Sequence, residues 1–468
     1  MPGSLLPLDV RLTSAVAVGK LARLASRRFG FGGGTVLPGV LAGCLDRGAL
    51  GKLTRGLTRG TVLVTGTNGK TTTCRLLAAM MREGGWRPIH NRAGANLTSG
   101  LTTALIEQSD LIGRSGADSA LFEVDEAIAP AVQAAVKPRA VVLTNLFRDQ
   151  LDRYGEVDHV VSVWREGIRS LGPDTRVILN ADDPALAALG RSVRGPVSYF
   201  GVDTPGESGS LDNVADTKNC PFCGSPLSYE LVRYAHLGTY RCPQCDFVRP
   251  DPTIAATTIV QQGVEATELT VTGPFGCRHW RFQLPGLYNV YNLLAAVATA
   301  TAVGIPIEAI ERALSDVTAA FGRLERIAVD GRTLFIVLVK NPVGLTQALS
   351  TILSEPTEKD LAILINDNLA DGTDVSWLWD AGVELLAGRC RSVLVSGTRG
   401  ADMAVRLKYA GVPVDRICHV ESVEQALDVG IAGVPVGGTL YVLPTYTAML
   451  ELRTLVGRRG YASRYWET

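Results

Sequence analysis

The sequence predicts an α/β protein with two doubly wound parallel sheets and one small insertion. Short apolar strands alternate with helical segments along most of the chain, which is typical of parallel sheets covered by helices on both faces. The alternation starts again after residue 326, and two Cys-x-x-C pairs interrupt its first part. We therefore expect a helical segment at 1–55, a central domain at 56–325 with an insertion at about 215–250, and a second α/β domain at 326–468.

The composition is that of a soluble protein with more than one domain. The chain has 468 residues, too many for a single hydrophobic core. It has 46 basic and 46 acidic residues, so no general affinity for polyanions is expected. No apolar run is long enough to span a membrane and no signal-peptide pattern is visible, so we expect a cytoplasmic protein.

Residues 10–29 have a helical pattern with an imperfect apolar stripe opposite a basic side. The stripe consists of Val10, Ala17, Val18, Leu21, Leu24 and Ala25. We expect this helix to pack on the first domain with its basic side in solvent. A basic amphipathic helix on a membrane surface is the alternative. A second short helix is expected over residues 40–53.

The stretch from Thr61 to Thr73 has the pattern of a phosphate-binding loop. A buried strand, a turn from Gly66 to Gly69 and a helix that opens with Lys70 and Thr71 follow one another. The N–H groups and the dipole of a helix start favour an anion, and the Thr71 hydroxyl can ligate Mg²⁺. A full pattern of this type needs glycine at position 64, where this chain has valine.

A later strand, Ser119 to Glu126, ends in acids, and the strand from Pro138 ends at Asn145. Because the carboxyl ends of parallel strands meet at one edge of a sheet, these oxygen ligands are expected beside the phosphate loop. They are of the type that hard cations prefer.

The two Cys-x-x-C pairs predict a structural zinc site. Eighteen residues separate the first pair from the second, and four thiolates at this spacing suit tetrahedral zinc. Zinc would stabilise a ribbon that is too small for a core of its own. The predicted ligands are Cys220, Cys223, Cys242 and Cys245.

Two further motifs concentrate polar side chains. Asn289 and Asn292 lie three residues apart at a predicted helix start, where an amide can pair with adenine. The segment 366–380 holds four acids and two tryptophans after a strand. Such a loop suggests a partner surface or a catalytic role.

The run from Thr65 to Thr72, Thr-Gly-Thr-Asn-Gly-Lys-Thr-Thr, resembles the nucleotide loop of the Mur ligase family, ATP-dependent enzymes that join an acid to an amine. Other elements of that family resemble the strand from Ser119 to Glu126, the predicted helix start with Asn292, and the segment 321–326. The resemblance implies a central P-loop ATPase domain followed by a Rossmann-like C-terminal domain. It implies catalytic roles for Lys70 and Glu123, and Mg²⁺ ligation by Thr71 and Glu123, with Asp125 and Glu126 as alternatives to Glu123. The implied ATP-binding residues are Gly66, Thr67, Asn68, Gly69, Lys70, Thr71, Thr72, Asn292 and Arg323.

Two positions differ from the family pattern. Gln150 stands where the family has a histidine that can ligate a second metal ion. Val337 stands where an acid would contact ribose, although Lys340 follows nearby and could reach a phosphate.

The ribbon and the run from Asp371 to Trp377, Asp-Gly-Thr-Asp-Val-Ser-Trp, resemble the branch of the family that amidates lipid II together with a GatD-type glutaminase. In that branch one Asp is thought to complete a Cys-His-Asp triad with the partner. The resemblance implies Asp374 for this role, with Asp371 as the second choice, and a C-terminal domain that binds the partner.

The implied reaction is ATP-dependent amidation of the α-carboxyl of D-glutamate in the lipid II stem peptide. An acyl phosphate and ammonia from the glutaminase would give D-isoglutamine for peptidoglycan, at the inner face of the cytoplasmic membrane. One alternative is a stand-alone Mur or folylpolyglutamate-type ligase that adds an amino acid. A nucleotide-switched zinc protein that binds nucleic acid is another, and the balanced charge argues against it.

Overall fold

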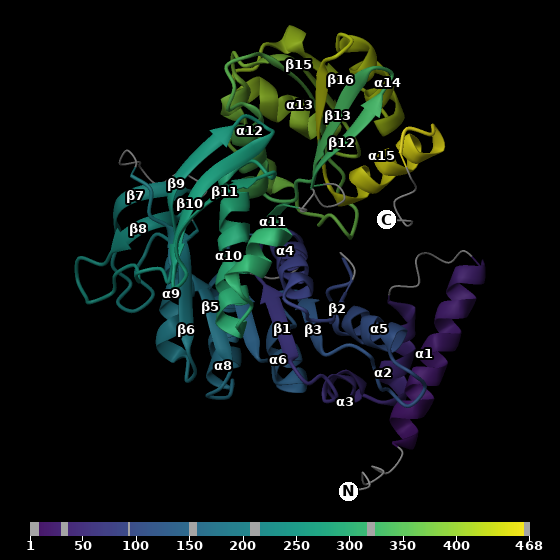
Figure 1. Ribbon diagram of the computed structural model, residues 1–468. Helices are drawn as coiled ribbons and strands as arrows, with labels where there is room; N and C mark the ends of the chain where they lie inside the picture. Colours follow the sequence, from purple (N-terminus) through teal and green to yellow (C-terminus); the bar gives the residue numbers. More distant parts are fainter. Residues whose placement is uncertain are drawn as a thin grey trace, which may run out of the picture.

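The computed structural model describes residues 9–29, 36–91, 94–148, 157–205, 216–315 and 323–462. Two large sheets with their helices make up most of the molecule, one below the other in Figure 1. A separate two-stranded hairpin, β7 (Ser228–Tyr234) and β8 (Leu237–Arg241), belongs to the insertion.

The first sheet has nine strands in the order β11-β10-β9-β6-β5-β4-β1-β3-β2. Strands β1 to β6 are parallel, as predicted, and β9 joins β6 in parallel before β10 and β11 turn back antiparallel. The bounds are β1 (Gly60–Thr65), β2 (Pro88–His90), β3 (Ser119–Glu123), β4 (Ala140–Leu143), β5 (Arg176–Asn180), β6 (Val197–Val202), β9 (Ile254–Gln262), β10 (Ala266–Gly273) and β11 (Gly276–Phe282).

Helices cover both faces of this sheet. In β1, Val62 and Val64 belong to the core under α4 and α10, whereas Leu63 packs with α5 and α6 on the opposite face. Burial on both faces explains why β1 is continuously apolar. The helices are α4 (Lys70–Glu83), α5 (Thr98–Gln108), α6 (Ala129–Val136), α8 (Val157–Arg169), α9 (Pro184–Leu189), η1 (Gly190–Ser192), α10 (Leu287–Val303) and α11 (Ile307–Ser315).

The N-terminal helices correct two predictions. Helix α1 (Val10–Phe29) has the predicted bounds, but it packs through Leu12, Ala15, Val16 and Gly19 rather than through the predicted stripe, whose Val10, Leu21 and Leu24 are exposed. A Cβ on Gly19 would lie 2.9 Å from Cδ1 of Ile106, so the small-residue side permits the closest approach.

The predicted helix at 40–53 is two helices, α2 (Leu37–Leu45) and α3 (Ala49–Thr54). The carboxylate of Asp46 accepts a hydrogen bond from the Gly48 N–H at 2.9 Å and forms the turn that separates them.

The second sheet has six strands in the order β12-β13-β17-β14-β15-β16, and all neighbours are parallel except the β12–β13 hairpin. This confirms the predicted second α/β sheet. Its strands are β12 (Arg323–Val329), β13 (Arg332–Val337), β14 (Lys359–Leu364), β15 (Cys390–Ser396), β16 (Ile417–His419) and β17 (Thr439–Pro444). Its helices are α12 (Pro342–Ile352), η2 (Ser376–Trp379), η3 (Val383–Leu386), α13 (Gly400–Tyr409), η4 (Val414–Arg416), α14 (Val423–Gly433) and α15 (Tyr446–Arg458).

Within the ranges described above, no helix combines the length and the apolar character that crossing a bilayer requires.

Candidate active site

The loop between β1 and α4 requires glycine at two positions. Gly66 and Gly69 have φ values of 132° and 84°. A Cβ on Gly69 would lie 1.8 Å from Oδ1 of Asn292, and one on Gly66 would lie 2.2 Å from Oγ1 of Thr144. The loop is therefore pressed against the start of α10 and the end of β4. It leads into the first turn of α4, whose N–H groups favour an anion.

Lys70 is held over this loop. Its Nζ donates to the Gly66 carbonyl at 2.6 Å and lies 3.0 Å from Oε2 of Glu126, and the lysine side chain is 9% exposed. Glu126 is in turn fixed by its own carbonyl, which accepts a hydrogen bond from Trp164 Nε1 at 3.0 Å. The predicted phosphate-binding cation and one of the predicted acids are thus an ion pair at the loop.

Glu123, at the end of β3, is buried, and its Oε2 has no hydrogen-bond partner among the described residues. Asn91 fixes its backbone by accepting from the Glu123 N–H at 2.9 Å and donating to the Glu123 carbonyl at 3.0 Å. A buried carboxylate oxygen without a partner is unfavourable unless a cation approaches it. This oxygen therefore fits the Mg²⁺ ligand that was predicted, with Thr71 in the adjacent helix turn.

A pocket opens beside the loop, and separate segments of the chain line it. Its polar wall includes Asn292, whose Nδ2 donates to Oδ1 of Asn289 at 3.2 Å, while Asn289 Nδ2 donates to the Pro285 carbonyl at 2.7 Å. These bonds orient the amide of Asn292 at the pocket. The lining comprises Asn68, Gly69 and Thr72 near the loop, Asn145, Phe147 and Tyr234, Leu284, Tyr288, Asn289 and Asn292 around the start of α10, and Leu324, Val337, Leu338, Val343, Gly344, Gln347 and Ala348 from the second α/β unit.

A pair of amides joins the loop to the second sheet. Asn341 Nδ2 donates to Oδ1 of Asn68 at 3.1 Å, and Asn68 Nδ2 lies 3.4 Å from Oδ1 of Asn341. Oδ1 of Asn341 also accepts from the Gly344 N–H at 2.8 Å and so caps α12. The Asn68 backbone is fixed from the other side by Asn145, at 2.8 Å. Sequence reasoning did not predict this contact, because nothing in either local pattern links residues 68 and 341.

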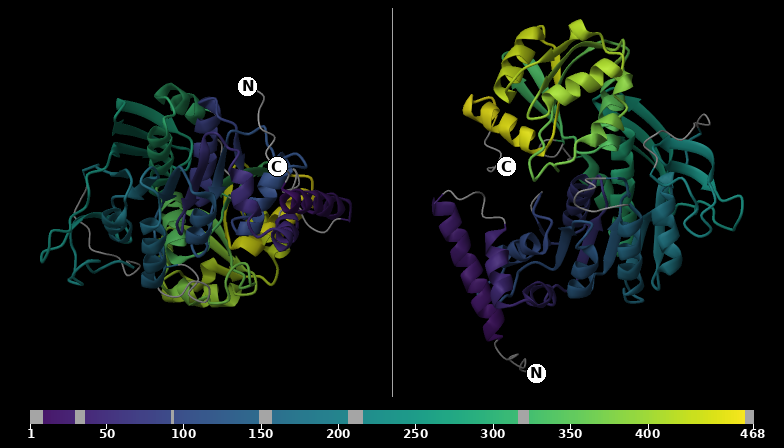
Figure 2. Two further views of the ribbon diagram at one scale, coloured as in Figure 1. Left: turned by 90° about the horizontal axis from the view of Figure 1, so that it is seen from below. Right: turned by 180° about the vertical axis from the view of Figure 1, so that it is seen from behind.

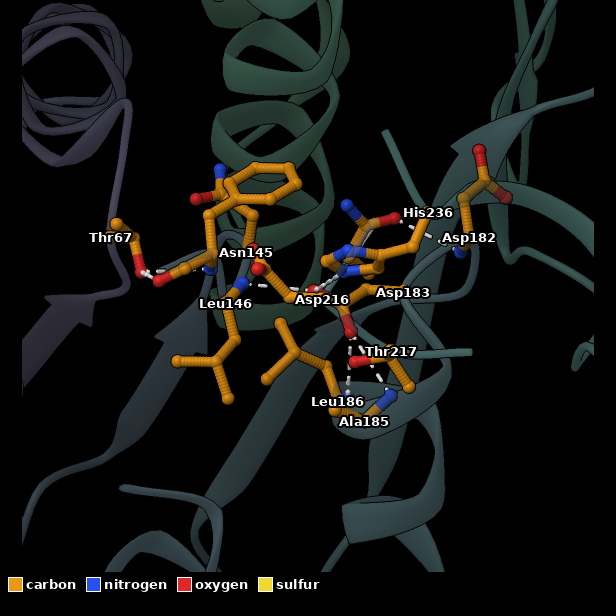
Figure 3. A network of polar contacts seen from close by, with 12 residues as sticks. Thr67, Asn145, Leu146, Asp182, Asp183, Ala185, Leu186, Asp216, Thr217 and His236 are labelled. Atoms are coloured by element: carbon orange, nitrogen blue, oxygen red, sulfur yellow. Dashed lines mark hydrogen bonds and ion pairs between the residues drawn. The ribbon is translucent and has the colours of Figure 1, made fainter. Parts of the chain in front are cut away.

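Figure 3 shows a polar network behind the loop. Thr67 Oγ1 accepts from the Phe147 N–H at 3.0 Å and donates to its carbonyl at 3.1 Å. Asp183 Oδ2 accepts from the Leu146 N–H at 2.9 Å and lies 3.5 Å from Nε2 of His236. His236 is fully buried, and its ring lies 5.0 Å from that of Phe147.

His236 comes from the turn of the inserted hairpin, so the insertion reaches the segment that fixes Thr67. Its neighbour Tyr234 packs at 5.9 Å from Phe147 and 5.7 Å from Tyr291 and lines the pocket. Asp216, also from the insertion, accepts from the Arg148 N–H at 2.7 Å, and burial raises its pKa. The sequence placed Tyr234 in a strand pair between the cysteine pairs, but it predicted none of these three residues at the site.

The base of the insertion is fixed by Asp182. Its carboxylate binds Arg249 Nε at 2.6 Å and accepts from the hydroxyl of Tyr291 at 2.6 Å. Burial raises the pKa of Asp182, while the charge of Arg249 opposes that shift. The insertion and α10 are thereby joined through one buried acid.

The four cysteines predicted to bind zinc come together. Their sulfur atoms all lie within 4.8 Å of one another, with Cys220 to Cys245 at 3.6 Å and Cys223 to Cys242 at 3.4 Å. Tetrahedral zinc with bonds of about 2.3 Å needs sulfur separations of about 3.8 Å. The Gln244 N–H lies 3.4 Å from the Cys242 sulfur, a contact that stabilises a thiolate. The donor set therefore fits a closed structural zinc site.

The loop at 366–380 of the second sheet places its two candidate acids, Asp371 and Asp374, in different surroundings. Asp371 is buried and binds the start of α15, where its Oδ1 accepts from the Thr447 N–H at 2.8 Å. Asp374 is only partly buried, and its Oδ1 accepts from the Ser376 N–H at 2.8 Å. Trp379 and Leu369 of the same loop are 55% and 87% exposed, so Asp374 lies in a surface with apolar character.

Two predicted positions cannot be placed. Gln150 lies outside the described residues, and Arg323 begins β12 but its side chain is outside them too. Val337, at the position of the family acid, lines the pocket.

Comparisons with known proteins identify the family. Residues 338–449 match the MurT ligase C-terminal family and residues 64–222 match the Mur ligase middle domain. The lipid II isoglutaminyl synthase (glutamine-hydrolyzing) subunit MurT of Streptococcus pneumoniae is 33% identical over 97% of this chain and 98% of its own length. The chain belongs to the MurT family. The MurT subunit of Staphylococcus aureus N315 is 34% identical over 86% of this chain and 89% of its own length.

Solved structures show that this MurT-family chain has the Mur ligase fold. A pseudomurein peptide ligase type C from Methanothermus fervidus superposes with a TM-score of 0.66 at 21% identity, covering 87% of this chain and 80% of that one. The MurF ligase of Thermotoga maritima in complex with ADP gives 0.60 at 13% identity, covering 86% and 81%. With its MurT relatives, the chain is a ligase of the Mur ligase family, and it has a four-cysteine cluster in its inserted hairpin module.

Proposed function

We propose that this MurT-family chain amidates the α-carboxyl of D-glutamate in the stem peptide of lipid II, with ATP as the energy source. The observation that carries the proposal is the phosphate loop with its buried acid, Glu123, beside a pocket, in a chain that aligns with MurT over almost its whole length. The names of the relatives supply the substrate, and the site supplies the chemistry.

The residues of the site suit phosphoryl transfer to a carboxylate. That reaction brings two anions together, so positive charge must surround the transferred phosphoryl group. Lys70 and the N–H groups at the start of α4 supply such charge from the protein. Thr71 and Glu123 would hold Mg²⁺, which supplies further neutralisation when bound. Asn292 would bind adenine in the pocket.

The two steps of the reaction balance as follows. A carboxylate oxygen of D-glutamate attacks the γ-phosphorus of ATP, and ADP leaves with the electrons of the broken bond. Ammonia then attacks the carbonyl carbon of the acyl phosphate, phosphate leaves, and one proton is lost to give the amide. Neutral ammonia is required, so a source that delivers it directly to the site has an advantage over dissolved ammonium.

A GatD-type glutaminase is the proposed source of ammonia. The name of the relatives includes glutamine hydrolysis, an activity that ordinarily needs a nucleophile with its own base and orienting acid. The described part of this chain has no Cys-His-Asp order in its sequence that suggests such a set. Asp374, half-buried in the same loop as the exposed Trp379, is the acid we assign to the partner's triad.

The test is product mass from a lipid precursor that contains D-glutamate. The purified chain receives ATP, Mg²⁺ and either ammonium chloride, or glutamine with and without a GatD-type glutaminase. We expect conversion of one carboxyl to an amide with ammonium alone, and with glutamine only when the glutaminase is present. Addition of a whole amino acid, or ATP hydrolysis indifferent to the precursor, would contradict the proposal.

A further inference from the structure

The N-terminal helices carry a concentration of exposed apolar side chains. Seven of the 21 large apolar side chains exposed in the described part of the chain lie between residues 10 and 45. Three of them, Val10, Leu21 and Leu24, are 68%, 65% and 66% exposed and belong to α1. Helix α1 runs along the outer edge of the molecule in all the views of Figures 1 and 2.

These α1 residues form one stripe. At 100° per residue, Val10, Leu21 and Leu24 fall within one third of the helix circumference, and the buried Ala15 and Gly19 lie on the opposite side. The helix therefore buries Leu12 and Val16 together with the small Ala15 and Gly19, and it presents three further large apolar side chains to solvent. Arg11 and Lys20 lie at the two flanks of the stripe, and Arg28 falls within it by its position on the helix. Arg23 lies on the packed side, where its Nε is 3.0 Å from Oε1 of Glu107.

The neighbouring helix α2 also exposes apolar side chains. Leu37, Val40 and Leu45 of α2 are 46%, 45% and 48% exposed, and α2 contains no charged residue. Helix α1 contains five basic residues and no acid, although the whole chain has equal numbers of both. An apolar stripe between basic flanks is the arrangement by which helices lie in the surface of an anionic bilayer, with aliphatic side chains inserted and cationic groups at the phosphates.

We propose that the exposed stripe of α1, together with α2, docks this protein on an anionic lipid surface. The inference deepens the proposed function, because a lipid-linked substrate has its reacting peptide close to such a surface. A second copy of the chain fits the stripe less well. Two such stripes in contact would bring basic helices together without acids between them.

The experiment is co-sedimentation of the full chain with vesicles of phosphatidylcholine and phosphatidylglycerol, and with vesicles of phosphatidylcholine alone. We expect binding to the anionic vesicles that weakens about tenfold with neutral vesicles and falls as salt rises. Leu21→Ser/Leu24→Ser should weaken binding to anionic vesicles by at least about tenfold. The matched control is Val414→Ser/Val436→Ser, which removes two side chains that are 65% and 76% exposed elsewhere, and it should bind like the unmodified chain.

Two further measurements make the outcome decisive. Amidation of detergent-solubilised precursor should be unchanged in Leu21→Ser/Leu24→Ser, so a failure of docking is distinct from a failure of the proposed function. Light scattering reports the oligomeric state. Equal vesicle binding by both double variants, no binding by the unmodified chain at low salt, or a dimer abolished by Leu21→Ser/Leu24→Ser without vesicle binding would each overturn the proposal.

Discussion

At the end of β3, Glu123 combines burial, a fixed backbone and a carboxylate oxygen without a partner among the described residues. Replacing it with glutamine keeps the size and removes the charge. Because Glu123→Gln removes a buried charge, we expect a melting temperature equal to or above that of the unmodified chain. We expect ATP turnover with precursor and ammonium to fall about 100-fold or more, because the proposed cation loses its ligand.

The measurement is turnover over a range of Mg²⁺ concentrations, with a thermal melt of each variant. Glu268→Gln is the matched control, since Glu268 is an exposed acid on β10 of the same sheet. Turnover near normal in Glu123→Gln would exclude Glu123 as the metal ligand and would make Asp125 the next candidate.

The two acids of the 366–380 loop should behave differently when each becomes asparagine. Asp374→Asn is expected to reduce glutamine-driven amidation by about 100-fold or more and to leave ammonium-driven amidation unchanged. Asp371→Asn weakens the contact with Thr447 at the start of α15, so we expect it to lower the free energy of unfolding by about 1 kcal/mol. Parallel assays with glutamine and with ammonium separate the two effects. Equal loss with both nitrogen sources in Asp374→Asn would show that the loop acts inside the ligase site.

His90, at the end of β2, predicts a pH dependence of stability. Burial, with the positive charges of Arg82 and Arg75, lowers the pKa of His90 to about 4. An unfolded histidine has a pKa of about 6.5, so below that pH the unfolded chain binds a proton that the folded chain excludes. This contribution to stability is present above about pH 6.5 and is lost as the pH falls toward 4, by about 2 kcal/mol between pH 7 and 5.

Urea unfolding at pH 7 and pH 5 measures this effect. His90→Gln cannot gain the charge, so its loss of stability over that range should be smaller than that of the unmodified chain by about the same amount. The same dependence of the free energy of unfolding on pH in both proteins would show that groups other than His90 cause it.

At the scale of elements, the sequence predicted whether a segment forms a helix or a strand better than it predicted which face of the element is buried. The bounds of α1 followed from its pattern, but its buried face did not, because the close approach at Gly19 and Ala15 outweighs the larger residues. The four cysteines were found because a tetrahedral metal site requires a fixed spacing of its ligands. The contribution of the same insertion to the pocket, through Tyr234, has no local signal, since it depends on where the hairpin packs.

If the cysteine cluster holds zinc, the inserted hairpin should couple that metal to nucleotide binding. Loss of zinc would then release the hairpin that positions Tyr234 at the pocket and His236 against Phe147. We expect Cys223→Ser to lower zinc content and to weaken binding of a fluorescent ATP analogue about tenfold. Cys277→Ser, the same change at an exposed cysteine outside the cluster, should alter neither. Zinc loss with unchanged nucleotide affinity would mean that the hairpin holds its place without metal.

At the scale of the whole molecule, the amide pair of Asn68 and Asn341 is one of several contacts between the two sheet units, beside the ion pair of Arg148 and Asp380. Asn341→Asp keeps the acceptor that caps α12 but removes the donor to Asn68, whereas Asn341→Ala removes both. We expect Asn341→Asp to raise the dissociation constant for ATP about 3- to 10-fold at nearly normal stability. Asn341→Ala should in addition lose about 1 kcal/mol of stability.

Equilibrium binding and thermal melts of the two variants distinguish these contributions. Small-angle scattering of Asn341→Asp without nucleotide should show a slightly larger radius of gyration, because one of the contacts between the sheets is weakened. An unchanged dissociation constant for ATP in both variants would show that the amide pair forms because the sheets are close together and does not stabilise their approach.

The phosphate loop could be predicted from the sequence because its residues are consecutive. The same holds for β3 and the acids that follow it. The amide pair, the Asp183–His236 contact and the apolar side of the pocket could not, because each joins segments from different elements. Local pattern predicts residues that act within one turn or one strand, whereas contacts between sheets depend on tertiary packing.

The composition of the pocket also sets the order in which the protein can assemble. Its walls extend in sequence from Asn68 to Ala348, so a growing chain cannot form the pocket until most of its length has been synthesised. If the pocket binds ATP as proposed, the nucleotide cannot guide the early steps of folding, because the pocket forms only when the two sheets have met. ATP would then be a late ligand that shifts the equilibrium away from partly folded forms. Its capture during synthesis would report that folding is complete.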